Sequence, residues 1–124
     1  MNNINKSRLN SKVILAYTLA QSGLYHVILT IKYMTTVVNI RKEPYDIYIG
    51  RAGKGQDGYF GNPFSKGTRE QNINDYEKYF FNRLLTDPEF KDRILSLKDK
   101  VLGCFCKPLA CHGDIIADYL DDLS

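Results

Sequence analysis

The residues best suited to chemistry gather in one short stretch of the chain. All three cysteines and one of the two histidines lie within nine residues, Cys104-Phe-Cys-Lys-Pro-Leu-Ala-Cys-His112, and Gly113 and Asp114 follow at once. Thiol and imidazole groups are the side chains that hold zinc and similar metals and that act as nucleophiles. The cluster therefore predicts where a functional site lies, while the residue types alone leave its reaction open.

Three roles are open for this cluster. In the first it is a zinc site, whose ligands would be Cys104, Cys106, Cys111 and His112, although their spacing departs from the usual Cys-x-x-Cys pattern. In the second, Cys111 or Asp114 is the reacting group of an enzyme and His112 carries the proton. In the third, the cysteines pack as small apolar residues, His112 fixes the loop, and Asp114 is an acid favoured by the helix dipole.

A second candidate site is the glycine-rich loop at residues 50–67. Its segment 53–58 matches Gly-x-Gly-x-x-Gly, but no helix is expected directly after it, so it is not a dinucleotide fingerprint. Arg51 predicts a contact with phosphate, and Asn62 predicts a contact with a base or a sugar. The alternative is a surface loop in which Arg51 pairs with an acid and Asn62 bonds its own backbone. The predicted ligand-binding residues are Gly50, Arg51, Gly61, Asn62 and Pro63.

Three short segments rich in apolar and β-branched residues predict the strands that carry these loops. They lie at residues 35–40, 47–49 and 101–106. Helices between the second and third segments would make a parallel βαβ connection. Ligands bind beyond the carboxyl ends of parallel strands, and the glycine and cysteine loops each follow a strand. We therefore expect both loops on one rim of the sheet.

Three helices are expected. Thr68 with Gln71 predicts a capping box, Asp87 before Pro88 predicts a second start, and the last helix is expected over 113–123. The side chains predicted to face the core are Ile73, Tyr76, Phe80, Leu84, Phe90, Ile94, Leu97, Ile115, Ile116, Tyr119 and Leu120. The predicted fold class is thus α/β: a small single-domain sheet of three or four strands, at least partly parallel, with three helices.

Length and charge predict one domain at residues 34–124, preceded by an extension at residues 1–33. The chain has 124 residues and is 44% hydrophobic, enough for one core. The extension holds four of the 17 basic residues and no acid, which leaves 13 basic against 14 acidic residues in the domain. A near-neutral domain argues against a general electrostatic grip on nucleic acid, so such binding would need a local basic patch.

Three interpretations of residues 1–33 are open. They could form a packed helix at 11–20 followed by a strand at 25–33, or an extension of little role, because Met34 begins a segment that looks like a natural start. A membrane anchor is disfavoured, because polar residues interrupt the apolar stretch. Neither a secretory signal nor a disulfide framework is evident, so a cytoplasmic location is expected.

Five motifs, taken in order, resemble a known family. They are Val-Val-Asn-Ile at 37–40, Tyr-Ile-Gly-Arg at 48–51, Gly-Asn-Pro-Phe at 61–64, Gly-Cys-Phe-Cys-Lys-Pro at 103–108 and Cys-His-Gly-Asp at 111–114. Over about residues 36–122 the chain resembles small bacterial and phage proteins grouped as domain of unknown function 4326. This resemblance brings no activity with it. It implies that the Gly-Arg, Gly-Asn-Pro and Cys/His motifs belong to one recurring pocket.

Together these patterns favour a pocket for a nucleotide-like or other phosphate-bearing ligand between the two loops, where it is bound and, in an enzyme, processed. The alternative is a zinc-stabilised module that binds nucleic acid or a partner protein without catalysis. A third interpretation is a phage-type factor that covers a host protein through exposed Tyr59 and Phe60. The sequence leaves enzyme status and oligomeric state open.

Overall fold

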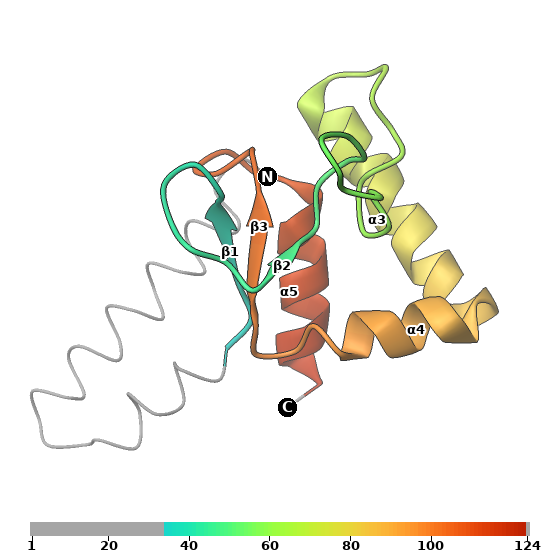
Figure 1. Ribbon diagram of the computed structural model, residues 1–124. Coiled ribbons are helices and arrows are strands. Elements are labelled where there is room, and N and C mark those ends of the chain that lie inside the picture. Colours follow the sequence, from blue (N-terminus) through green and yellow to red (C-terminus); the bar gives the residue numbers. More distant parts are fainter. Residues whose placement is uncertain (1–33, 124) are drawn as a thin grey trace, which may run out of the picture.

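Three short strands form one parallel sheet in the part of the chain that the computed structural model describes, residues 34–123 (Figure 1). Their spatial order is β1-β3-β2, and β3 pairs in parallel with both neighbours. The strands are β1 (Thr36–Asn39), β2 (Ile47–Tyr48) and β3 (Val101–Cys104). The predicted α/β sheet is confirmed. The predictions of a helix, a strand or a membrane anchor within residues 1–33 lie outside the described residues.

Strand β3 is shorter than predicted, since it ends at Cys104 and leaves Cys106 in the loop. Its last ladder bond runs from the Ile40 N–H to the Cys104 carbonyl at 3.0 Å. Beyond that point the Asn39 side chain takes over from the backbone of β1, and its Nδ2 donates to the Lys107 carbonyl at 2.8 Å. The regular ladder ends here, and the Asn39 side chain binds the irregular backbone of the cysteine loop instead.

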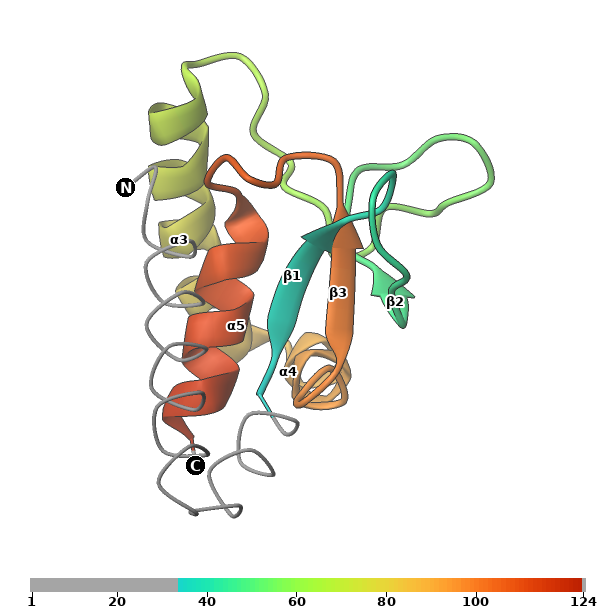
Figure 2. The same cartoon turned by 90° about the vertical axis from the view of Figure 1, so that its left-hand side faces the viewer.

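Three helices complete the fold: α3 (Arg69–Thr86), α4 (Pro88–Leu95) and α5 (His112–Asp122). The predicted capping box of Thr68 and Gln71 begins α3, and Asp87 caps α4 by accepting from the Phe90 N–H. Helix α5 begins one residue before the prediction, with Cys111 at its N-cap. Figure 2 shows α5 along one side of the sheet and α3 beyond it.

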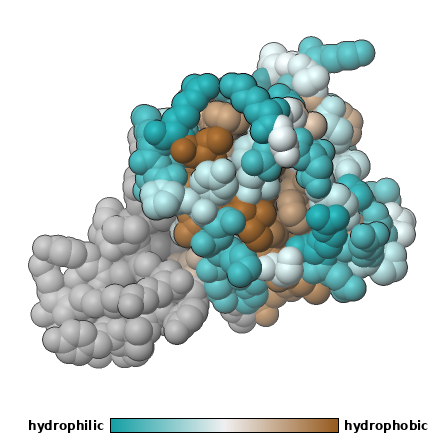
Figure 3. Space-filling view, viewed as in Figure 1, coloured by the Kyte–Doolittle hydropathy of each residue, from teal (hydrophilic) through white to brown (hydrophobic). Residues whose placement is uncertain are grey.

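The predicted core is confirmed except at one residue. The stripes of α3 and α4 and the apolar residues of α5 are buried, whereas Tyr119 is only partly buried, with its ring edge against Phe80. Gly113 lets α5 approach the sheet closely, because a Cβ there would lie 2.7 Å from Ile49 Cδ1. On the face drawn in Figure 3, apolar side chains show in a hollow framed by hydrophilic ones.

One further expectation concerns the surface. The third interpretation needed exposed Tyr59 and Phe60, but Phe60 is buried, and the guanidinium of Arg93 stacks 3.4 Å from the centre of the Tyr59 ring. None of the helices in residues 34–123 is both long enough and apolar enough to cross a membrane.

Tyr76 offers a test of the core. Its ring is fully buried, and its hydroxyl has no hydrogen-bond partner among the described residues. A buried unpaired hydroxyl destabilises a fold, so Tyr76→Phe is expected to raise the free energy of unfolding by about 1 kcal/mol in urea denaturation. Tyr79→Phe is the matched control and should lower it, because the Tyr79 hydroxyl accepts from Arg83 Nη1 at 2.7 Å. Equal losses in both variants would contradict this account.

Candidate functional site

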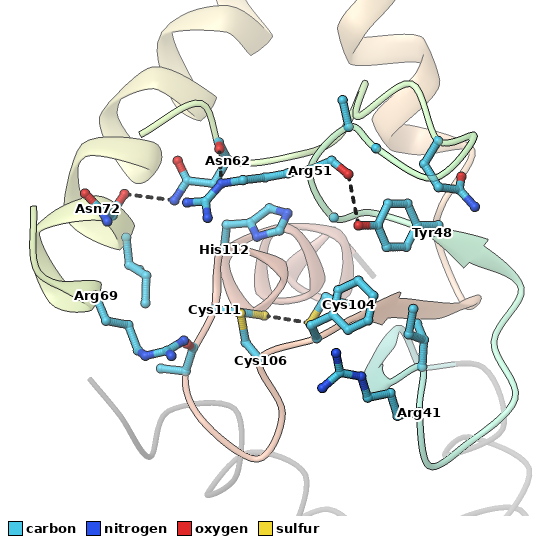
Figure 4. A pocket seen from close by; sticks show the side chains of 18 of the residues that line it. Arg41, Tyr48, Arg51, Asn62, Arg69, Asn72, Cys104, Cys106, Cys111 and His112 are labelled. Atoms are coloured by element: carbon cyan, nitrogen blue, oxygen red, sulfur yellow. Dashed lines mark hydrogen bonds between the residues drawn. The ribbon is translucent and has the colours of Figure 1, made fainter. Parts of the chain in front are cut away.

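A cavity of about 790 Å³ opens where the three strands end. The glycine loop and the cysteine loop both line it, together with the residues that follow β1 and the first turns of α3 and α5. Figure 4 shows the two loops on opposite sides of this space. The expectation that both loops share one rim of the sheet is therefore confirmed, because parallel pairing brings the carboxyl ends of β2 and β3 together.

The charge of the cavity differs from that of the domain. Among the described residues that line it, four are basic and none is acidic: Arg41, Arg51, Lys54 and Arg69. Residues 34–124 as a whole carry 13 basic and 14 acidic residues, the total of 17 basic residues less the four before residue 34. The fold thus gathers positive charge from three separate segments around one space.

Arg51 closes the glycine loop as well as lining the cavity. Its Nε donates to the Asn62 carbonyl at 3.0 Å, and its Nη2 donates to the Phe64 carbonyl at 2.7 Å. The Tyr48 hydroxyl in turn donates to the Arg51 carbonyl at 2.9 Å. These partners are backbone carbonyls rather than an acid, so the positive charge of Arg51 stays at the cavity.

Asn62 is engaged with the backbone on both sides of its amide. Its Nδ2 donates to the Asn72 carbonyl at 3.1 Å, and its Oδ1 accepts from the Phe64 N–H at 2.9 Å. This geometry corresponds to the turn that the sequence offered as the alternative to a ligand contact. Of the five predicted ligand-binding residues, Gly50, Arg51 and Asn62 line the cavity, while Gly61 and Pro63 do not.

The three cysteines form one group at the cavity wall. Their sulfur atoms all lie within 4.8 Å of one another, and the Sγ atoms of Cys104 and Cys111 are 3.4 Å apart. All three are free thiols; Cys104 and Cys111 are buried, and Cys106 is half-buried. Three soft sulfur ligands this close could hold a metal ion.

Hydrogen bonding within the group sets its acidity. Bonds from the Cys104 and Cys111 thiols lower the pKa of Cys106, and the nearby Arg69 guanidinium adds to the effect. Bonds to Cys104 and Cys106 raise the pKa of Cys111, because its thiol loses a bond when it ionises, and a bond to Cys106 raises the pKa of Cys104. Hydrogen bonding within the group therefore favours ionisation of Cys106, the half-buried member, over ionisation of its two buried neighbours.

His112 lies at the cavity but outside the sulfur group. Its Nε2 is 2.7 Å from the Ile49 carbonyl, and its ring meets the Tyr76 ring edge-on at 5.0 Å. Burial lowers the pKa of His112, so the neutral imidazole donates from Nε2 at pH 7. Of the four predicted metal ligands the structure thus brings together the three cysteines, and His112 ties the start of α5 to the end of β2.

Asp114, predicted as a reacting or orienting group, is held in place by two partners. Its Oδ2 accepts from the Cys111 N–H at 3.1 Å, and its Oδ1 pairs with Lys107 Nζ. It is 4% exposed and borders a second cavity of about 330 Å³ rather than the one with the thiols. This arrangement corresponds to the first-turn acid that the sequence offered as the alternative.

Sequence reasoning missed three residues that the structure brings to the site: Asn39, Arg41 and Arg69. Asn39 holds the cysteine loop, and Arg41 stacks 4.9 Å from the centre of the Phe105 ring. Arg69 is the first residue of α3, and its Nη1 donates to the Ala110 carbonyl at 3.3 Å. The sequence held a signal for Arg69. A cation in the first turn of a helix is disfavoured by the helix dipole, so its presence there suggests a role other than stabilising the helix.

Comparison with known proteins gives two similarities. The sequence model of a family described as "Domain of unknown function (DUF4326)" matches residues 34–122. The chain is also 37% identical over 89 residues to a protein of Enterobacteria phage T4 described as an uncharacterized 12.4 kDa protein in the nrdA-td intergenic region. That alignment covers 70% of this chain and 78% of the phage protein. No solved structure matches.

Gly61 tests the packing of the glycine loop. A Cβ on this residue would lie 2.7 Å from the Gly50 carbonyl oxygen and 3.0 Å from Arg51 Cα. Because those atoms are backbone and cannot rotate away, Gly61→Ala is expected to lower the free energy of unfolding by about 1–3 kcal/mol in urea denaturation. In the control Gly67→Ala the nearest atom is the side-chain oxygen of Gln71, which can move at the cost of one capping hydrogen bond. A smaller loss is expected there, and equal losses would contradict the account.

Proposed function

We propose a function for this chain, which belongs to the family described as "Domain of unknown function (DUF4326)". The residues that line its cavity are the basis for it. The cavity binds a nucleotide-like or other phosphate-bearing ligand between the glycine loop and the cysteine loop. The observation that carries this proposal is the segregation of charge: four basic and no acidic side chains among the described residues that line the space, in a domain whose charges nearly cancel. Such a site attracts an anion.

Helix ends and arginine chemistry support a phosphate group in particular. The first turns of α3 and α5 both border the cavity, and a helix N-terminus carries partial positive charge. The guanidinium groups of Arg41, Arg51 and Arg69 offer planar pairs of donors that match phosphate oxygens. Arg51 and Arg69 are each already held by a backbone carbonyl, so part of the entropic cost of ordering their side chains is met before a ligand arrives.

The aromatic wall supports a ligand with a flat ring. Phe105 is 45% exposed, Arg41 stacks over its ring, and Tyr48 meets it edge-on at 6.1 Å between centroids. Exposed rings backed by arginine are surfaces on which nucleobases stack. The volume of about 790 Å³ lies within the usual range of small-molecule sites. Base recognition in this proposal rests on stacking, since the amide of Asn62 is already bonded.

The polar groups predicted to react are already engaged, and this bears on the chemistry of the site. His112 bonds to the Ile49 carbonyl, and Asp114 bonds to Lys107. The thiols remain at the cavity wall, so any processing of the ligand falls to them. A cytoplasmic location suits three free thiols, because that compartment keeps cysteines reduced.

Isothermal titration with AMP, ADP, ATP and pyrophosphate tests the proposal. Binding is expected in the wild-type protein, and Arg69→Met should weaken it roughly tenfold or more, because a charge-assisted hydrogen bond contributes about 1.5–3 kcal/mol. Lys78→Met is the matched control: Lys78 is an exposed cation on the same helix and does not line the cavity. Its binding should equal that of the wild type. No binding by any of the four compounds would overturn the proposal.

The second candidate function is a zinc-stabilised module that binds nucleic acid or a partner protein without catalysis. The closeness of the three sulfur atoms is the observation that favours it. In that function zinc holds the fold together, and a chelator unfolds the protein. We expect the opposite, because the buried core extends through all three helices and the sheet, well beyond the cysteines. Far-ultraviolet circular dichroism with and without chelator decides: retained helical signal supports the ligand pocket, and unfolding supports the module.

A further inference from the structure

We infer that Cys104, Cys106 and Cys111 bind one zinc-like divalent cation through three sulfurs, and that its fourth coordination position faces the phosphate-binding cavity. This inference rests on the proposed function and deepens it, since the cation becomes part of the ligand site rather than a support for the fold.

The spacing of the sulfurs suits such an ion. A tetrahedral zinc with bonds of about 2.3 Å to sulfur places its sulfur ligands roughly 3.8 Å apart. The three Sγ atoms here lie within 4.8 Å of one another, and those of Cys104 and Cys111 are 3.4 Å apart. Small side-chain shifts therefore suffice to reach zinc geometry. Thiolate ligands favour zinc and exclude magnesium and calcium, which take oxygen ligands.

The protein supplies three ligands, because the neighbouring candidates are turned elsewhere. Among the residues that the structure describes, no histidine or acid joins the sulfur group. His112 is directed at the Ile49 carbonyl, and Asp114 at Lys107 and the Cys111 N–H. Structural zinc sites close their coordination with four protein ligands, whereas sites that act on a ligand keep one position open. An open position is what three sulfurs leave.

The open position falls on the cavity. All three cysteines line it, and Cys106 is half-buried rather than enclosed. Three thiolates and a divalent cation carry a net charge of −1. The positive charge of Arg69 offsets it, because this side chain reaches the cysteine loop from α3 and its Nη1 donates to the Ala110 carbonyl. A phosphate oxygen in this cavity is thus within the surroundings of both the cation and the arginines. In this inference the bound cation and the arginines contact the same phosphate group, which accounts for thiols and guanidinium groups lining one cavity.

Cobalt(II) in place of zinc gives the first part of the test. The wild-type protein is expected to show an intense near-ultraviolet band from sulfur-to-cobalt charge transfer, with one equivalent bound. Cys106→Ser and, as a second variant, Cys106→Ala should weaken this band, with folding checked by circular dichroism. His112→Gln should leave it unchanged, because His112 is not a ligand. No band, or a band that His112→Gln alters as much as Cys106→Ser, would overturn the inference.

Addition of AMP gives the second part. AMP is expected to shift the visible bands of bound cobalt in the wild type and in Lys78→Met, and to shift them much less in Arg69→Met, while the charge-transfer band persists in all three. AMP that binds by titration calorimetry without shifting the visible bands would leave the proposed function standing and overturn this inference. A charge-transfer band with no binding of AMP, ADP, ATP or pyrophosphate by calorimetry would overturn both the proposed function and the shared site.

Discussion

The position of β3 between β1 and β2, parallel to both, is the constraint on which the site depends. The ladders continue past the strands, since the Ile40 N–H bonds the Cys104 carbonyl and the Ile49 N–H bonds the Gly103 carbonyl. Three carboxyl ends are thereby fixed within one hydrogen-bonded row, and each continues into a loop of the cavity. Residues far apart in the sequence meet because parallel strands end on the same edge.

Most of the polar side chains at this edge serve the backbone. Asn39 holds the cysteine loop, Asn62 and Arg51 hold the glycine loop, and His112 ties the start of α5 to the end of β2. Two long irregular loops contain many backbone N–H and C=O groups that no strand or helix pairs. Those that are buried require hydrogen-bond partners. Side chains that look catalytic by type are therefore used to shape the loops. The thiols, and the guanidinium N–H groups that Arg51 and Arg69 do not use for backbone carbonyls, are the groups that could meet a ligand.

Opposite chemistries meet on the cavity wall. Sulfur is soft and apolar, whereas the guanidinium groups of Arg41, Arg51 and Arg69 are exposed cations that line the same cavity. A thiolate site needs neighbouring positive charge, and a phosphate site needs the same charge, so one set of arginines can serve both. The Arg69 guanidinium donates to the Ala110 carbonyl at the cysteine loop, so its charge lies where it could serve both the thiolates and a phosphate.

The sequence by itself determined the elements, the core and the motifs of the site. Periodicity and capping placed α3, α4 and their buried stripes, because these depend on contacts within a few residues. Only the tertiary structure decided which motif residues face the cavity. His112 and Asp114 have the right chemical types, but their partners, the Ile49 carbonyl and Lys107, come from other turns of the backbone. Charge segregation likewise became visible only in space, because Arg41 and Arg69 approach the cysteines through folding and not through sequence.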